Sequence, residues 1–270
     1  MRLHISIPSC GLVALVLSAG AWAQIVSGGQ SSFVSAAPAS TSLVYSASVP
    51  HLSADTALTL YQSGLAQQAN TLAAYTVTSL VQAELPESAQ RAEFELQQHY
   101  CAPSSLEFSP LRSSGDAFVK SNVIARLLQS EVDHVHRHEQ SQTAINSANY
   151  KFSYKGISKV NDVAVHVYDV KPHKKRVGLF KGKIFVDAST GNLVRAQGRI
   201  VKSPSFFIKK IDFVQDYARV DGFTLPVHLH SEAQTRIIGK TIVDIANRDY
   251  HAQPVAGALA MQTAAIDGSN

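Results

Sequence analysis

The sequence contains few cysteines: Cys10 and Cys101 are the only two in 270 residues. Cys10 lies in an N-terminal segment that we expect to be removed, so one thiol remains in the mature chain. A single thiol cannot form an intramolecular disulfide. The fold must therefore be stabilised by a hydrophobic core, which a domain of this size can supply.

Long apolar segments are also missing. Residues 11–17 (GLVALVL) form an apolar run that is shorter than the about 18 residues needed to span a bilayer. Ala21-Trp22-Ala23 follows with the small-x-small pattern of a cleavage site. We therefore predict that residues 1–23 are a signal peptide cleaved after Ala23, with export to the periplasm or, as a second choice, secretion. A retained N-terminal anchor is the alternative.

The chain has little excess charge of either sign. It carries 24 basic and 20 acidic residues, and removal of Arg2 with the signal peptide leaves 23 against 20, or +3 with histidine neutral. An excess of this size is too small to indicate a nucleic-acid partner. We expect no nucleic acid among its ligands.

Motifs of catalysis are absent as well. The sequence has no Gly-x-Ser-x-Gly, no His-Glu-x-x-His and no Gly-rich phosphate loop. His99 and Cys101 stand two apart and can share one face of a strand, which is a starting point for a thiol nucleophile. No third orienting group is evident, and a buried, inert thiol is the simpler interpretation. We therefore expect no enzymatic activity and no cofactor.

Two segments have the pattern of helices. Ser53 can cap the first, and Asp55 lies in its first turn, where negative charge is favourable. The second is predicted over residues 116–132 from a stripe of apolar residues at helical spacing. Residues 24–52 are rich in Ser and Ala, with no charge up to Pro50, and are typical of a flexible leader.

The rest of the chain has the alternation of β-strands. Residues 75–81 and 92–100 alternate, and so do most residues from Tyr150 to Tyr250, with a hairpin turn at 187–192. Few strands are followed by a helix long enough for a parallel crossover, so the sheet should be antiparallel. We predict one α+β domain over residues 53–250, with a curved antiparallel sheet whose concave face is covered by two helices, and a flexible tail at 251–270.

Three stretches resemble the LolA-like family of periplasmic outer-membrane lipoprotein-sorting proteins. They are DASTGNLVR at 187–195, KSPSFFIKKIDFVQDY at 202–217 and DGFTLPV at 221–227. The resemblance implies an incomplete antiparallel barrel, a LolA-like half-barrel, with an apolar concave face and helices acting as a lid. It also implies a carrier of a lipid or an acylated protein, because the best-known members hold acyl chains in that cavity.

Alternation along the strands gives a set of candidate lining residues. A half-closed barrel with apolar inner side chains either packs shut or encloses space, and enclosed space of this kind suits an acyl chain. Ordinary core packing without a cavity, in a protein that docks a partner through its surface, is the alternative. The predicted lining residues are Phe152, Tyr154, Val165, Val167, Ile184, Val186, Val194, Ala196, Ile200, Leu225, Val227 and Leu229.

Histidines form two groups. His134, His136 and His138 can share one face of a strand, and the first and last share one face of a helix, so a metal-binding protein is a further alternative. A solvated helix end explains the same residues without a metal. His228 and His230 alternate with apolar neighbours, and a polar outer face of the sheet explains them.

Lysines surround a short aromatic stretch. Lys202, Lys209 and Lys210 flank residues 206–208 (FFI), and such a strip can contact anionic lipid head groups during transient contact with a membrane surface. An edge strand protected by lysines against pairing with another sheet is the alternative.

Overall fold

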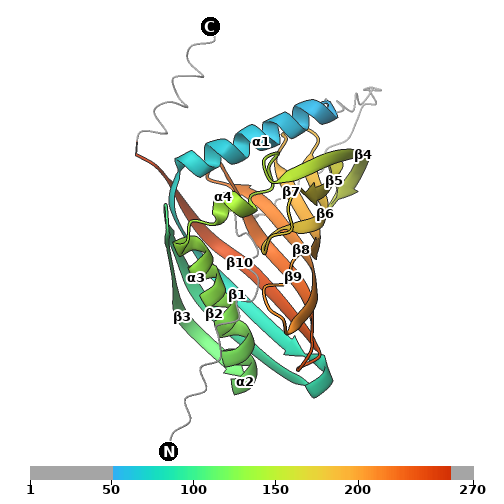
Figure 1. The fold of residues 1–270 in the computed structure, drawn as a ribbon. Coiled ribbons are helices and arrows are strands. Elements are labelled where there is room, and N and C mark those ends of the chain that lie inside the picture. The colour runs from blue at the N-terminus through green and yellow to red at the C-terminus, as the bar shows by residue number, and fades with distance from the viewer. Residues whose placement is uncertain (1–50, 257–270) are drawn as a thin grey trace, which may run out of the picture.

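The structure is a computed structural model, and it describes residues 51–256. These residues form one ten-stranded antiparallel sheet, strongly curved, with helices on its concave side (Figure 1). The predicted α+β class is confirmed, and the open, curved sheet is the half-barrel that the resemblance implies. The strands are β1 (Leu72–Leu85), β2 (Gln90–Cys101), β3 (Ser105–Gly115), β4 (Tyr150–Val160), β5 (Val163–Pro172), β6 (Phe180–Asp187), β7 (Leu193–Ile200), β8 (Ile208–Val220), β9 (Phe223–Thr235) and β10 (Lys240–Pro254).

Strands that are consecutive in sequence pair with each other, except β3 and β4, and the first strand, β1, also pairs with the last, β10. The order across the sheet is β3-β2-β1-β10-β9-β8-β7-β6-β5-β4, so β3 and β4 are the edges. β8 is therefore an interior strand, and the explanation of its lysines as protection of an edge is wrong. β10 continues to Pro254 because Leu72 of β1 pairs with that residue, so ordered structure extends past the predicted boundary at 250.

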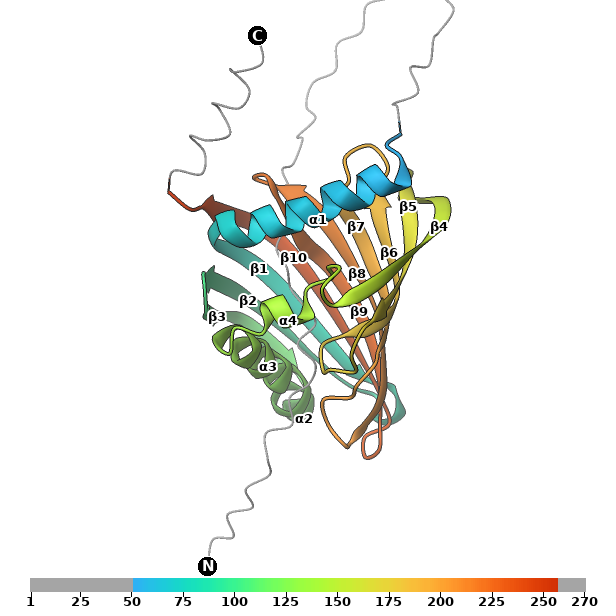
Figure 2. The ribbon, with the colours of Figure 1, turned by 45° about the horizontal axis from the view of Figure 1, so that its top comes forward.

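The helices lie where the sheet curves inward. α1 (Ala54–Thr71) crosses one end of the sheet (Figure 2). One continuous helical segment packs against β1–β3, and it consists of α2 (Ala117–Val119), the π-turn η2 (Lys120–Ile124) and α3 (Ala125–His136). α4 (Gln140–Thr143) is a single turn, and η1 (Pro86–Ser88) joins β1 to β2. Among residues 51–256, no helix has the length and apolar character needed to cross a membrane. The predicted signal peptide, most of the leader and residues 257–270 lie outside the described residues.

A pair of glycines lies where two strands approach each other closely. Gly182 of β6 pairs with Gly198 of β7, and a Cβ added at Gly198 would lie 2.4 Å from the carbonyl oxygen of Lys181 and 2.8 Å from Cα of Gly182. Side chains are excluded there, since real Cβ atoms are not found at such distances. Glycine thus allows the tight approach of β6 and β7.

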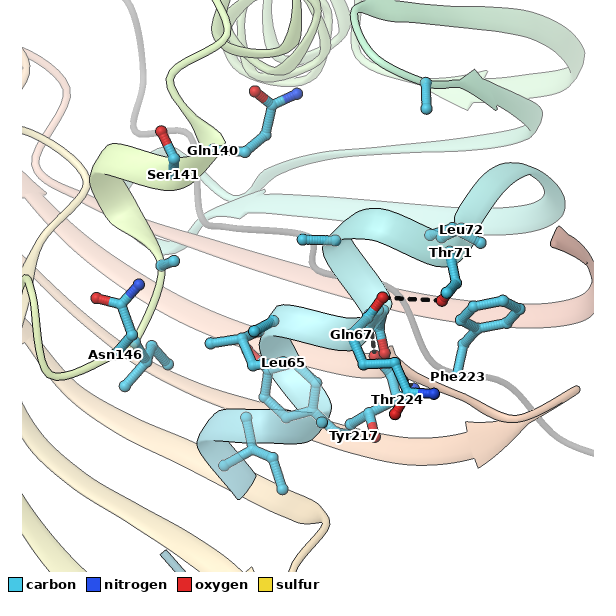
Figure 3. Close-up of a pocket in the computed structure, with 18 of the residues that line it drawn as sticks. Leu65, Gln67, Thr71, Leu72, Gln140, Ser141, Asn146, Tyr217, Phe223 and Thr224 are labelled. Atoms are coloured by element: carbon cyan, nitrogen blue, oxygen red, sulfur yellow. Dashed lines mark hydrogen bonds between the residues drawn. The ribbon is translucent and has the colours of Figure 1, made fainter. Parts of the chain in front are cut away.

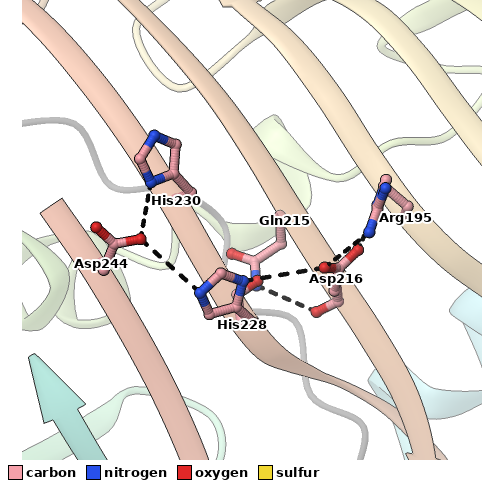
Figure 4. A network of polar contacts seen from close by, with 6 residues as sticks. All are labelled: Arg195, Gln215, Asp216, His228, His230 and Asp244. Carbon is pink, nitrogen blue, oxygen red and sulfur yellow. Dashed lines mark hydrogen bonds and ion pairs between the residues drawn. The ribbon is translucent and has the colours of Figure 1, made fainter. Parts of the chain in front are cut away.

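The outer face of the sheet carries a row of charged groups that crosses four strands (Figure 4). Arg195 of β7 donates two hydrogen bonds to Asp216 of β8, one of them 3.0 Å long. His228 of β9 lies 3.9 Å from Asp216 and 3.8 Å from Asp244 of β10, and His230 is bonded to Asp244 at 2.7 Å. These histidines therefore belong to a polar outer face, as the alternation indicated.

Candidate functional site

A pocket of about 1230 Å³ lies under α1 at one end of the half-barrel. We call it the α1 pocket. Its walls come from α1 from Leu60 onward, the last turns of α3, the segment 140–148, and the ends of β1, β2, β8, β9 and β10 with the adjoining turns. Leu106 of β3 and Leu193 of β7 complete them. Figure 3 shows Leu65, Gln67 and Thr71 of α1 facing Asn146 on one side and Phe223 on the other. The volume exceeds the roughly 300–1000 Å³ usual for small-molecule sites.

The walls of the α1 pocket are predominantly apolar. Aliphatic side chains reach it from α1, the start of β1, β3, the segment after α4 and the start of β7. They are Leu60, Leu65, Leu72, Leu106, Ile145 and Leu193. Several are shared with the main core cluster, so the pocket is an unfilled extension of the core. Towards the opposite end, the space between sheet and α3 is filled by core residues such as Val81, Leu96, Leu127 and Phe213.

Four tyrosines add aromatic surface to the walls. Tyr61, Tyr75, Tyr100 and Tyr217 line the pocket, and the rings of Tyr75 and Tyr100 stack with centroids 5.0 Å apart. Burial raises the pKa of Tyr61 and of Tyr75 above the ordinary value of a phenol. These two hydroxyls therefore remain protonated, and the hydroxyl of Tyr75 accepts a hydrogen bond of 2.7 Å from Gln98. The tyrosines thus add bulky, uncharged surface that suits hydrocarbon, and Glu131, Arg219 and Asp221 are the charged residues of the lining.

The first turn of α1 is fastened to the sheet. His166 is hydrogen-bonded to the carbonyl oxygen of Leu52 at 2.9 Å, and the hydroxyl of Tyr168 donates to the carbonyl oxygen of Ala54 at 2.5 Å. The backbone N–H of Leu52 also donates to Ala188, at 2.7 Å. Residue 52, predicted to belong to the flexible leader, is thus part of the folded domain.

The rest of α1 is held at two more points. The hydroxyl of Tyr61 donates to the carbonyl oxygen of Ile145 at 2.8 Å. The side-chain amide of Gln68 donates to the carbonyl oxygen of Thr224 at 3.1 Å and accepts from its N–H at 2.7 Å. α1 is therefore tied along its length to the elements that form the pocket, which holds the space open against collapse.

One wall of the pocket carries a polar chain of side chains. His134 is bonded through Nδ1 to Glu139 at 3.2 Å and through Nε2 to Thr143 at 3.3 Å. Burial lowers the pKa of His134, outweighing the opposite effect of Glu139, and this favours the neutral ring. The order hydroxyl–imidazole–carboxylate is that of a hydrolytic triad. Thr143, however, is 3% exposed and does not line the pocket, so its hydroxyl cannot reach a substrate there and the chain instead ties α4 to α3.

The histidine cluster does not converge on one point. His134 is buried in the pocket wall, whereas His136 and His138 are exposed at the end of α3. In the part of the chain that the structure describes, no three His, Cys, Asp or Glu side chains gather in a way that could hold a metal ion. The alternative of a metal-binding protein is therefore not supported.

The environment of Cys101 also differs from expectation. Cys101 is exposed at the end of β2, so the interpretation as a buried thiol is wrong. The reason is its position in the last pair of β2 with β1 and β3, where the curved sheet ends.

The twelve predicted lining residues lie elsewhere in the sheet, and none of them borders the α1 pocket. Eight are buried: Val165, Val167, Ile184, Val186, Ala196, Ile200, Leu225 and Leu229. Phe152 is half-buried against the main core cluster, and Tyr154 is 46% exposed on β4. Lys202, Lys209 and Lys210 are exposed and are also remote from the pocket walls.

Two of the twelve are the extra residues of β-bulges. Val186 pairs with Leu193, so Val194 has no partner of its own on β6, and Leu193 enters the core. Val227 likewise falls between Pro226 and His228, which pair with successive residues of β8. A bulge shifts the alternation by one residue, and this is why simple period-two counting misplaces Val194 and Val227.

The pocket residues that the sequence did not indicate come mainly from α1 and from turns. Gly64 and Gln67 lie on α1, and Gly222 and Thr224 lie at the β8–β9 turn. Leu58, Tyr61, Leu65 and Leu72 recur at helical spacing, so the sequence indicates an apolar face on this helix. Three of them, Tyr61, Leu65 and Leu72, line the pocket.

Comparison with known proteins gives only distant likenesses. No family model and no curated protein matches the sequence. Similar solved structures include a DUF1329 family protein from Desulfovibrio piger, with 9% identity and a TM-score of 0.37, covering 75% of this chain and 93% of that chain. A LolA superfamily protein from Nitrosomonas europaea has 8% identity and a TM-score of 0.33, covering 74% and 93%.

A third similar structure is an outer membrane lipoprotein-sorting protein domain from Vibrio parahaemolyticus. It has 11% identity and a TM-score of 0.37, and the match covers 76% of this chain and 91% of that chain. At such identities and scores the comparisons say nothing about what this chain binds. The candidate site therefore has to be judged on its own chemistry.

Proposed function

We propose that this protein is an exported, non-enzymatic carrier that holds the acyl chain of a lipid or of an acylated protein in the α1 pocket. The observation that carries the proposal is a large, predominantly apolar pocket covered by a helix that is hydrogen-bonded along its length to the sheet and to Ile145. Export to the periplasm rests on the predicted signal peptide. A protein with a wholly filled core would lack this space.

The chemistry of the pocket suits a hydrocarbon chain with a polar end. Transfer of each methylene from water into the pocket contributes about 0.8 kcal/mol to the free energy of binding. Ten buried methylenes therefore contribute about 8 kcal/mol before the entropic costs of binding are subtracted. The exposed Arg219 at the rim donates to Asn192 at 3.0 Å, which places polar groups where a head group would emerge. The walls would hold the hydrocarbon chain, and the rim would hold the head group.

A fluorescent long-chain fatty acid tests the proposal. We expect saturable binding with one probe per protein and a rise in fluorescence, because the ring-lined pocket excludes water. Unlabelled long-chain fatty acid should displace the probe, and a four-carbon acid should not, since it buries too few methylenes. Absence of saturable binding, after any co-purified lipid has been extracted, would count against the carrier function.

A further inference from the structure

Two loops meet at the end of the sheet that lies away from α1. The β7–β8 loop (201–207) and the β9–β10 turn (236–239) are joined by two hydrogen bonds, from the N–H of Arg236 to the carbonyl oxygen of Phe207 and from its Nε to that of Phe206, each 2.8 Å long. We call these loops the tip (Figure 2). β8 has 13 residues and runs from the tip to the pocket, a span on the order of 40 Å.

The tip exposes large apolar side chains. Phe206 is 76% exposed, Ile237 is 72% exposed and Phe207 is 45% exposed. The rings of Phe206 and Phe207 lie edge to face with centroids 5.9 Å apart. Scattered apolar residues are common on surfaces, but three on two adjoining loops form a patch of the kind that marks an interaction site.

The loop that carries the phenylalanines is internally bonded. The hydroxyl of Ser203 lies 2.8 Å from the carbonyl oxygen of Ser205 and 2.7 Å from that of Ile208, and the N–H of Phe207 donates to the hydroxyl of Ser205 at 3.1 Å. The guanidinium of Arg236 lies 4.6 Å from the centre of the Phe206 ring. The hydrogen bonds within this loop therefore hold the two phenylalanine rings in their exposed positions.

Positive charge surrounds the patch. Residues 201–210 and 236–240 contain five basic residues and no acidic one: Lys202, Lys209, Lys210, Arg236 and Lys240. The neighbouring acids Asp212 and Glu232 are paired with Lys210 and Lys240, and Glu87 of η1 accepts a hydrogen bond from the backbone N–H of Lys240 at 3.0 Å. Within residues 51–256, Lys202 and Lys209 form no ion pair and are exposed.

We propose that the tip docks this protein on an anionic phospholipid membrane surface. Lysine and arginine are attracted to anionic head groups, and the projecting phenylalanine and isoleucine side chains bury themselves among the lipids at the boundary with the acyl chains. The same combination fits a flat, charged, fluid surface better than a shaped protein groove, since the two loops project and contain no acidic residue of their own. The proposal does not depend on the α1 pocket being occupied.

Vesicle flotation tests the proposal. The exported chain should float with vesicles of phosphatidylcholine and phosphatidylglycerol, and much less with phosphatidylcholine alone, and high salt should weaken the binding. The double variant Phe206→Ser, Phe207→Ser should bind at least about tenfold more weakly. Burial of even one phenylalanine ring contributes enough free energy to change the affinity by that factor. Lys202→Glu with Lys209→Glu should abolish the preference for anionic vesicles.

The matched control is Leu111→Ser with Ile157→Ser, which removes two apolar side chains that are each 59% exposed on the two edge strands. This variant should float like the wild type. Thermal melts of all variants show whether the fold is kept. Three results would overturn the proposal: equal binding to neutral and anionic vesicles, unchanged binding of the tip variants, or no binding of the wild type to either vesicle. The third result would favour a protein partner.

Discussion

Replacement of Gly64 by tryptophan should abolish binding of the fluorescent fatty acid while leaving the fold intact. Gly64 lies in the middle of α1 and lines the pocket, and a Cβ added there meets no heavy atom within 4 Å. The indole therefore enters space that the acyl chain needs. Because glycine is unfavourable inside a helix by up to about 1 kcal/mol, the melting temperature should be unchanged or slightly higher.

Two control variants separate blocking from damage. Gly64→Ala should keep full probe binding, since one methyl group takes little of the pocket. Ala196→Trp, at a core position that is 1% exposed and does not border the pocket, should instead destabilise the protein by about 1–3 kcal/mol through overpacking. Wild-type affinity in Gly64→Trp would show that the probe binds elsewhere.

Replacement of Gly198 by valine should cause a large loss of stability. The added Cβ would lie 2.4 Å from a backbone oxygen and 2.9 Å from the Phe180 ring, and backbone atoms cannot move aside as a flexible side chain can. We expect a loss of about 3 kcal/mol or more in the free energy of unfolding. For a domain of this size, that corresponds to a melting temperature lower by about 6–12 °C.

The adjacent Gln197 provides the control, because it is half-buried on the same strand and valine is favoured in strands. Gln197→Val should shift the melting temperature by only a few degrees, as scanning calorimetry can measure. If Gly198→Val melted together with Gln197→Val, the close approach of β6 and β7 would not be a requirement of the fold.

Features set by neighbouring residues were predictable from the sequence. The hydroxyl of Ser53 accepts the N–H of Thr56 at 3.1 Å and begins α1 where expected. Asp116 caps the second helical segment, accepting from Phe118 at 2.8 Å, and Asp187 forms the predicted turn by accepting from Ser189. Such contacts span two or three residues, so residue type alone is enough to indicate them.

β3 could not be predicted in the same way. Its residues are mostly exposed, and Pro110 interrupts it, so it lacks an apolar alternation. It becomes a strand because β2 offers it a pairing edge, with Leu106 opposite Tyr100. Pairing of this kind depends on the folded neighbour and leaves little trace in the segment itself.

The sequence predicted the kind of site but not the residues that form it. An apolar space inside a curved sheet was expected, but the inner face of β5–β9 is largely taken up by the core, and the pocket opens at the end covered by α1. The close approach of Gln68 to Thr224 joins residues 156 positions apart. Nothing in either local segment indicates that contact, so the residues of the pocket follow from tertiary structure.

Native mass spectrometry of the protein purified from its own compartment tests the acyl-carrier function most directly. We expect a chain that begins at Gln24 and carries the added mass of one acyl lipid, which organic extraction removes. Gly64→Trp, purified in the same way, should show the mass of the chain alone. A wild-type spectrum with no added mass, together with no uptake of fatty acid after purification, would contradict the acyl-carrier function.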